Sequence, residues 1–189
     1  MSRPKERLLE AVVEVALSAG IAEQSLRAIA EAAGTSHRML IHHFGSREGL
    51  LVEVSKAVEA RQRALFTGLG DGVGGNVFDY ARVYWEQLRD PKLSSQERLF
   101  FEVYGQALQG RPWATPLLEG VIDDWVGPVA ESLIAAGTSP KSAHVDARLC
   151  IAVARGLLLD VLATADGKAV DAAMERFVEL LRGALVPGD

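Results

Sequence analysis

Residues 25–51 contain the pattern that decides the fold, and they read SLRAIAEAAGTSHRMLIHHFGSREGLL. Ser25 and the pair Thr35-Ser36 are residue types that cap helix N-termini. Gly34 is suited to end the first helix, because glycine enters the left-handed conformation without a Cβ penalty. The pattern therefore predicts two short helices joined by a tight turn, a helix-turn-helix whose second helix can enter the major groove of DNA.

The two helices differ in the side chains that they offer. The first is rich in alanine between 28 and 33, which allows the second to pack closely across it. The expected core contacts of the second helix are Met39, Leu40, Ile41 and Phe44. Its remaining side chains can form hydrogen bonds and so reach phosphates and base edges. They are Ser36, His37, Arg38, His42 and His43.

The segments on either side of this motif also predict helices. Apolar residues recur at helical spacing over 4–19 and are followed by Gly20. Ser46 can cap a long helix over 47–66, and GLGDGVGG at 68–75 is typical of a flexible linker. No segment predicts a strand, so we expect an all-α fold. The helices expected after the linker cover about 76–90, 95–109, 113–136, 140–165 and 168–185.

Helix signals set several of these boundaries. Ser94 and Glu97 have the spacing of a capping box, and Ser139-Pro140 combines an N-cap with a first-turn proline. Pro128 lies inside the third of these helices and should kink it or split it in two. The residues expected to close the last helix are Gly183 and Pro187.

Residues 70–75 match the bare GxGxxG string of dinucleotide-binding sites. That chemistry requires a strand before the glycines and a helix after them. Here a polar helical stretch, EARQRALF, precedes the glycines, and no β-branched run lies nearby. We therefore interpret the string as a plain linker.

Composition limits the class of protein. With 189 residues, 49% apolar and 24% charged, the chain has the composition of a globular protein. Cys150 is the single cysteine, which excludes an internal disulfide and a zinc site built on paired cysteines. No apolar run approaches the roughly 18 residues of a membrane span, and the first ten residues carry charges. We expect a cytoplasmic protein without a metal or a cofactor.

The charges and the aromatic residues are unevenly distributed. Residues 1–48 carry six basic and six acidic side chains, while 14 basic and 19 acidic side chains follow. The whole net charge of −5 therefore lies after residue 48. Nine of the twelve aromatic residues fall between Phe78 and Trp125. This asymmetry indicates two parts with different functions.

The stretch 25–51 resembles the tetracycline-repressor-like (TetR) family of bacterial transcriptional regulators. The resemblance rests on the Ile-Ala pair, the Gly turn, the short second helix ending at Phe, and Ser-Arg-Glu before a Leu that opens a long helix. It implies a three-helix DNA-binding domain over 1–48, followed by a helical domain over 49–189 for ligand binding and dimerisation. The implied function is a regulator, most simply a repressor, that a small hydrophobic molecule releases from operator DNA.

Two residues depart from the family pattern. Ile41 stands where most members have a tyrosine whose hydroxyl reaches a phosphate, so His42 is left as the alternative contact. Arg47 replaces the usual lysine, which keeps the charge and adds bidentate phosphate geometry. Arg38 is the best candidate base reader, because arginine to guanine is the commonest specific contact. For His42 and His43 a solvated surface position remains the alternative. The candidate DNA-binding residues are Arg27, Thr35, Ser36, His37, Arg38, His42, His43 and Arg47.

The resemblance places the ligand site and the dimer interface in the second part of the chain. Candidate ligand residues are Tyr84, Trp85, Phe101, Tyr104, Trp113, Trp125 and Asp123. The alternative is that these aromatic residues are ordinary core and the carboxylate is surface. Residues 149–163 are apolar on nearly all sides, which exceeds what one buried face requires. Candidate interface residues are Leu149, Val153, Gly156, Leu157, Val161, Met174, Phe177 and Leu181.

Two other classes of protein stay open at this point. The chain can be an all-helical enzyme or ligand carrier that keeps the helix-turn-helix only for packing, although it contains no HExxH, paired-cysteine or GxSxG motif. It can also be a helical adaptor that binds another protein through its acidic face. Selective, salt-sensitive DNA binding would separate a regulator from both.

Overall fold

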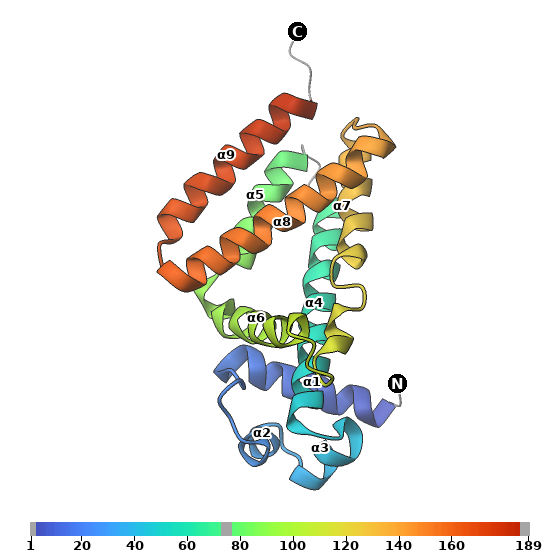
Figure 1. Cartoon of the computed structure of the whole chain (residues 1–189), viewed down its shortest axis with the longest axis vertical. Helices are drawn as coiled ribbons and strands as arrows, with labels where there is room; N and C mark the ends of the chain where they lie inside the picture. The colour runs from blue at the N-terminus through green and yellow to red at the C-terminus, as the bar shows by residue number, and fades with distance from the viewer. Residues whose placement is uncertain (1–2, 73–76, 186–189) are drawn as a thin grey trace. The chain divides into compact units, whose positions relative to one another are not determined.

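The computed structural model describes residues 3–72 and 77–185, and within these ranges every regular element is a helix (Figure 1). The predicted all-α fold is confirmed. No helix in the described ranges is both long and apolar enough to cross a membrane. The α-helices are α1 (Arg3–Ala19), α2 (Leu26–Ala32), α3 (His37–Phe44), α4 (Arg47–Gly72), α5 (Val77–Leu88), α6 (Ser94–Leu108), α7 (Asp123–Ala135), α8 (Pro140–Thr164) and α9 (Gly167–Leu185), with 3-10 helices η1 (Pro91–Leu93) and η2 (Thr115–Leu118).

The chain forms two compact units that are each built from two stretches of sequence. The first unit is Met1–Gln62 with Pro91–Glu119, and the second is Arg63–Asp90 with Gly120–Asp189. Helix α4 therefore contributes its first part to one unit and its last part to the other. The predicted division into a DNA-binding part over 1–48 and a ligand-binding and dimerisation part over 49–189 stays a prediction.

Serine caps start the helices around the turn motif. Ser25, Ser36 and Ser46 each accept a hydrogen bond at Oγ from the backbone N–H three residues further on, at 3.2, 3.2 and 3.0 Å. Gly34 follows α2 with a φ of 64°, in the left-handed region that favours glycine. These positions confirm the predicted starts and the predicted stop.

Helix α3 buries only one narrow face. Leu40 and Phe44 are buried, whereas Met39 and Ile41 are exposed. The prediction that all four pack in the core was therefore wrong for two of them. The reason is geometric, because residues four apart share a helix face and their immediate neighbours point about 100° away.

Helix α4 continues to Gly72, past the end predicted at residue 66. The glycines of the expected linker did not stop it, since each costs a helix only about 1 kcal/mol relative to alanine. Residues 73–75 of the GxGxxG string, and Pro187, lie outside the described residues. Gly183 also lies inside its helix, because α9 runs on to Leu185.

The helix predicted over 113–136 is broken, but the break is not at Pro128. Gly120 has a φ of 70°, and a Cβ placed there would lie 2.5 Å from the Oδ1 atom of Asp124. The chain therefore leaves η2, turns at this glycine and begins α7, which continues through Pro128. The left-handed conformation of Gly120 therefore separates η2 from α7, whereas the missing N–H of Pro128 does not end α7.

The predicted capping box at Ser94 is absent. Glu97 is buried, and its carboxylate accepts a hydrogen bond from the Gln62 Nε2 atom of α4. Helix α6 follows directly on η1, with Leu93 at its N-cap and no side-chain cap. The continuous backbone turn from η1 into α6 makes a side-chain cap unnecessary.

Two apolar clusters lie in the core of the second unit. In one, Ala130, Ala143 and Ala147 pack with Leu133, and these small side chains allow α7 and α8 to lie close together. In the other, aromatic rings from α4, α5 and α7 meet. Its buried members are Phe66, Tyr80, Trp125 and Ile151, with Tyr84, Ile122, Val126 and Val129 packed against them. We call this second group the aromatic cluster.

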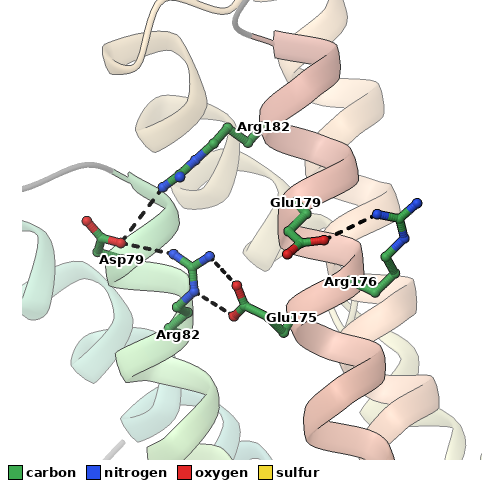
Figure 2. Close-up of polar contacts among 6 residues, drawn as sticks. All are labelled: Asp79, Arg82, Glu175, Arg176, Glu179 and Arg182. Atoms are coloured by element: carbon green, nitrogen blue, oxygen red, sulfur yellow. Dashed lines mark hydrogen bonds and ion pairs between the residues drawn. The ribbon is translucent and has the colours of Figure 1, made fainter.

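Helix α5 is held to α9 by ion pairs (Figure 2). The Nε and Nη2 atoms of Arg82 donate to the two carboxylate oxygens of Glu175 at 2.6 and 2.5 Å. The Nη1 atom of Arg82 donates to Asp79 at 2.9 Å, and Arg182 lies 3.9 Å from the same carboxylate. The face of α5 toward α9 thus carries ion pairs. Tyr80 and Tyr84 of the same helix belong to the aromatic cluster.

The Arg82–Glu175 pair should depend on pH. The hydrogen bond from Arg82 lowers the pKa of Glu175, so the pair contributes stability above the ordinary range of a glutamate carboxyl and loses it as the pH falls through the lowered value. We expect Arg82→Met to return the pKa of Glu175 to the ordinary range in an NMR titration of side-chain carboxyls. Arg176→Met is the control, because Arg176 pairs with Glu179 at 3.2 Å on the outer face of α9 (Figure 2). An unchanged pKa for Glu175 in Arg82→Met would contradict the pairing.

Candidate nucleic-acid interface

Helices α2 and α3 are joined by a turn of fixed geometry. Gly34 N–H donates to the Glu31 carbonyl at 3.1 Å, and Thr35 N–H donates to the Ala30 carbonyl at 2.8 Å. Together with the left-handed glycine, these bonds end α2 and direct the chain into Ser36, the N-cap of α3. The start of α3 is therefore set by backbone hydrogen bonds rather than by side-chain packing alone.

The outer face of α3 is polar at its centre. His42 lies opposite the buried pair Leu40 and Phe44, and Arg38 lies one turn before His42. His37, Arg38 and His42 are all exposed. The exposed centre of α3 can therefore donate hydrogen bonds and carry positive charge.

The other candidate DNA-binding residues surround this face. Arg27 is exposed on α2, and Ser36 is exposed with its Oγ used for capping. Thr35 is half-buried in the turn. His43 is also half-buried, and its ring centroid lies 4.8 Å from that of His42 and 6.4 Å from that of Phe44. His43 is thus the histidine of α3 that lies nearest to the core.

Arg47 lies differently from the expectation for a phosphate contact. Its Nε atom donates to the Gln24 carbonyl at 2.9 Å, and its Nη2 atom donates to the Ala22 carbonyl. Both carbonyls belong to the turn between α1 and α2, which Gln24 also closes with a bond from Nε2 to the Gly20 carbonyl at 2.6 Å. The guanidinium therefore ties the first turn of α4 to the α1–α2 turn.

The junction between α3 and α4 is equally tight. Gly49 has no room for a Cβ, which would collide with the carbonyl oxygen of Phe44. Lys5 of α1 lies 5.5 Å from the centroid of the Phe44 ring and 3.2 Å from the carboxylate of Glu53. The C-terminal end of α3, at Phe44, is therefore held by contacts from both α1 and α4. The spacing of residues in the sequence does not reveal this restraint.

The structure separates the predicted ligand residues. Tyr84 and Trp125 belong to the aromatic cluster of the second unit. Trp85 is buried elsewhere in the second unit, and its Nε1–H donates to the carboxylate of Asp171 at 3.0 Å. Asp123 is exposed and pairs with Arg148 at 2.8 Å. The remaining candidates, Phe101, Tyr104 and Trp113, belong to the first unit.

The predicted ligand residues do not include two rings of the aromatic cluster, those of Phe66 and Tyr80. The centroid of Phe66 lies 4.9 Å from that of Tyr80, 5.1 Å from that of Tyr84 and 6.1 Å from that of Trp125. The available signal was the helical spacing of Tyr80 and Tyr84, which places them on one face of α5. The position of Phe66 could not be found in this way, because it lies near the stretch that suggests a linker.

The predicted interface residues divide between buried and exposed positions. Leu149 and Gly156 are exposed on α8. Met174 is buried, and Leu181 packs against the alanine-rich cluster within the unit. The half-buried members are Val153, Leu157, Val161 and Phe177.

Comparisons with known proteins agree with this geometry. Residues 8–54 match the family model of bacterial regulatory proteins, tetR family. A TetR-family transcriptional regulator from Pectobacterium atrosepticum has 18% identity and a TM-score of 0.74, with 100% of this chain and 99% of that chain covered. A transcriptional regulator from a Rhodococcus species has 20% identity and a TM-score of 0.73, with 95% and 96% covered.

A third similar structure is a regulator from Saccharomonospora viridis in complex with choline. It has 20% identity and a TM-score of 0.70, with 95% of this chain and 97% of that chain covered. A comparison with curated protein sequences finds no match.

The turn geometry, the exposed polar face of α3 and the match over residues 8–54 define a helix-turn-helix DNA-binding protein. Residues 8–54 thus carry the sequence pattern of the tetR family of bacterial regulatory proteins, and the whole chain has the fold of the transcriptional regulators that it resembles. This family typically consists of regulators that are not enzymes.

Arg47 can be tested by a change that keeps its charge. Arg47→Lys retains the positive charge but lacks the planar fork that places two separate nitrogen atoms against the Gln24 and Ala22 carbonyls. We expect it to lower the free energy of unfolding by about 1–2 kcal/mol, corresponding to two weakened hydrogen bonds, and to speed hydrogen exchange of residues 20–25. Arg61→Lys is the control, because Arg61 forms an exposed pair with Glu14. Unchanged stability in Arg47→Lys, with weaker DNA binding in Arg47→Ala, would instead support a phosphate contact.

Proposed function

We propose that this regulator is a repressor that leaves its operator when a small hydrophobic molecule binds in the second unit. The observation that carries this proposal is the continuity of α4. One helix bears Arg47, which is tied to the α1–α2 turn, and Phe66, which is part of the aromatic cluster about five turns later. A shift of the ring at residue 66 is therefore transmitted along a hydrogen-bonded element to the DNA-binding helices.

The mechanism has two states. Without the effector, the α3 helices of a dimer occupy two operator half-sites and block transcription. An effector inserted among the rings favours a second position of α4, in which the half-site spacing is lost. The effector can weaken DNA binding only by its difference in affinity for the two states, typically about 1–3 kcal/mol.

The chemistry of the aromatic cluster supports an effector site. The hydroxyl of Tyr80 is buried and has no hydrogen-bond partner. Burial raises the pKa of Tyr80, so the phenol stays neutral and can donate. An unsatisfied buried polar group costs about 1–3 kcal/mol, which a polar atom of a bound molecule would recover. Pockets with aromatic walls and few polar groups are typical of small-molecule sites.

The rim of the cluster adds charge. The guanidinium of Arg63 lies 5.9 Å from the centroid of Trp125 and 3.4 Å from the carboxylate of Asp124. The choline complex of the structurally similar regulator from Saccharomonospora viridis supports small-molecule binding in this fold. Tyr84 and Trp125 remain our first ligand candidates, joined by Phe66 and Tyr80. Trp85, Phe101, Tyr104, Trp113 and Asp123 remain candidates that the sequence predicts.

On the DNA side, Arg38 and His42 are proposed to read base edges from the centre of α3. Arginine to guanine is the commonest specific contact in the major groove, and both side chains are exposed. Arg27 and Thr35 are proposed to contact phosphate, which positions the helix without reading sequence. The flanking candidates for either kind of contact are Ser36, His37 and His43.

A homodimer is proposed because an apolar stripe on α8 is exposed. Val145, Leu149 and Leu159 are the large side chains of this stripe. Its members alternate at steps of three and four residues, the spacing of a helix–helix seam. Two half-sites about one helical turn apart also require two copies of α3. The complete α8 stripe is Val145, Leu149, Ala152, Gly156, Leu159 and Ala163.

Release by an effector is the decisive test. We would select genomic fragments bound by the wild-type protein, confirm salt-sensitive binding, and screen hydrophobic compounds for release of the selected operator. Tyr80→Phe should require about fivefold more of an active compound, which corresponds to one lost hydrogen bond of about 1 kcal/mol. Its operator affinity without compound should be unchanged. Val83→Ala is the control, because Val83 is an exposed side chain of the same helix and is not a ligand candidate.

Several outcomes would contradict the proposal. Absence of selective binding to any fragment would favour a helix-turn-helix used only for packing. A compound that binds the protein tightly without changing operator affinity would show that the cluster is not coupled to DNA binding. Increased affinity in the presence of the compound would indicate an activator or a co-repressor mechanism.

Arg38→Ala should lose preference for the selected operator while retaining non-specific binding.

The dimer is tested by charge in the stripe. Leu149→Glu combined with Leu159→Glu places carboxylates in the proposed seam and should give a monomer in sedimentation experiments at micromolar concentration. The helices should remain folded, because both side chains are about half exposed in the single chain. Leu108→Glu, at 66% exposure on α6, is the control and should leave the mass unchanged. A wild-type protein that sediments as a monomer would refute the dimer.

A further inference from the structure

The recognition helix α3 exposes two large apolar side chains. Met39 is 41% exposed and Ile41 is 39% exposed. Over residues 3–62, all of which the structure describes, these are the only large apolar side chains in the exposed class. The exposed apolar surface of the N-terminal helices is therefore concentrated on the eight residues of α3.

The two side chains have a defined place on the helix. With about 100° per residue, Ile41 lies about 60° to one side of Arg38, and Met39 lies about 60° to the other side of His42. Around the exposed face the order is therefore Ile41, Arg38, His42, Met39. A polar centre is bordered on each side by an apolar side chain, and we call this pair the apolar border.

Core packing does not explain the apolar border. Leu40 and Phe44 already provide the buried face of α3, and Leu40 is fully buried. The formation of α3 does not require apolar side chains at 39 and 41 either. Polar residues at these two positions would leave the N-cap at Ser36 and the C-cap at Gly45 unchanged. The border lies on the face of α3 that is proposed above to contact DNA, where an apolar group has one distinctive partner.

That partner is the C5 methyl group of thymine. Among the four bases, only thymine presents an aliphatic group in the major groove, and apolar side chains read it by contact. The methyl lies nearer the groove wall than the hydrogen-bonding atoms of the base. Side chains that border a polar centre are therefore better placed to reach it than side chains at the centre.

We propose that Ile41 and Met39 are specificity-determining residues that contact thymine methyl groups in the operator half-site. This inference rests on the DNA-binding function and adds to it the base class that the apolar border reads. It also gives Ile41 a positive purpose, since this exposed apolar side chain cannot form a hydrogen bond to phosphate. Arg38 and His42 then read the neighbouring base edges.

The test removes a single methyl group at a time. A half-site is first defined by selecting duplexes from a random library with the wild-type protein. Each thymine is then replaced by deoxyuridine, which deletes the C5 methyl and leaves O4 and the base pairing intact. Affinities are measured by fluorescence anisotropy at one fixed salt concentration, because salt changes all DNA affinities.

We expect deoxyuridine at one or two positions to weaken wild-type binding about fourfold per half-site. This corresponds to the roughly 0.8 kcal/mol gained by burying one methyl group. Ile41→Ala or Met39→Ala should abolish the penalty at its own position, so that thymine and deoxyuridine operators bind equally. Ile41→Val should retain most of the penalty, because it keeps a branched methyl group.

Controls separate this reading from loss of folding. Leu108→Ala removes an even more exposed apolar side chain from α6 and should keep the full deoxyuridine penalty. The ratio of thymine to deoxyuridine affinity within one variant is independent of the fraction of folded protein. Thermal unfolding of each variant confirms that its helices are intact.

Two results would overturn the inference. One is a selected half-site whose thymines all tolerate deoxyuridine, or which contains no thymine. The other is a deoxyuridine penalty that is the same in Ile41→Ala, Met39→Ala and the wild type. In both cases selective DNA binding would still stand, so the failure is distinct from failure of the proposed function. Loss of all selective binding by the wild type would instead refute both.

Discussion

Helix α4 is one continuous element whose N-terminal end is held by hydrogen bonds, and the rest of the structure depends on this constraint. Ser46 caps its first turn, Arg47 binds two carbonyls of the α1–α2 turn, and Gly49 permits the close approach of the Phe44 carbonyl. Because these three contacts restrict the start of α4, the orientation of α3 cannot change independently of it. The far part of the same helix carries Phe66 into the aromatic cluster. The proposed release by an effector needs such a shared element, since two sites are coupled through an element whose states both of them bias.

Charge is distributed in keeping with this division. The six basic residues before residue 49 balance six acidic ones, and the acidic excess of the chain lies in the remainder. A polyanion such as DNA is therefore tolerated at one end and repelled by the rest. Inside the second unit, charge has a different use. The ion pairs between α5 and α9 hold one face of α5 (Figure 2), while the tyrosines of α5 stay among apolar rings. The whole-chain charge of −5 averages these two situations and describes neither.

Local signals predicted the helix-turn-helix closely because its geometry is set by short-range chemistry. Ser25, Ser36 and Gly34 act within a few residues of their own position, and the structure confirms all three. Where a tertiary partner competes, the local reading fails. Glu97 has the right spacing for a capping box but binds Gln62, which lies 35 residues earlier in the chain. Arg47 has the charge for a phosphate contact, yet two of its nitrogen atoms donate to the turn before α2. A pattern cannot anticipate partners that only folding brings near.

The sequence by itself determined the all-α class, the turn motif and the division of charge, since helical periodicity, capping and composition act locally. Only the tertiary structure decided which side chains of α3 face outward, because burial depends on which side of α3 the neighbouring helices cover, α2 among them. Met39 and Ile41 have the same apolar character as Leu40, so residue type alone does not distinguish them. The same holds for the aromatic cluster, in which Phe66 meets Tyr80 and Trp125 from separate helices. Side-chain type is written in the sequence, whereas its surroundings result from packing.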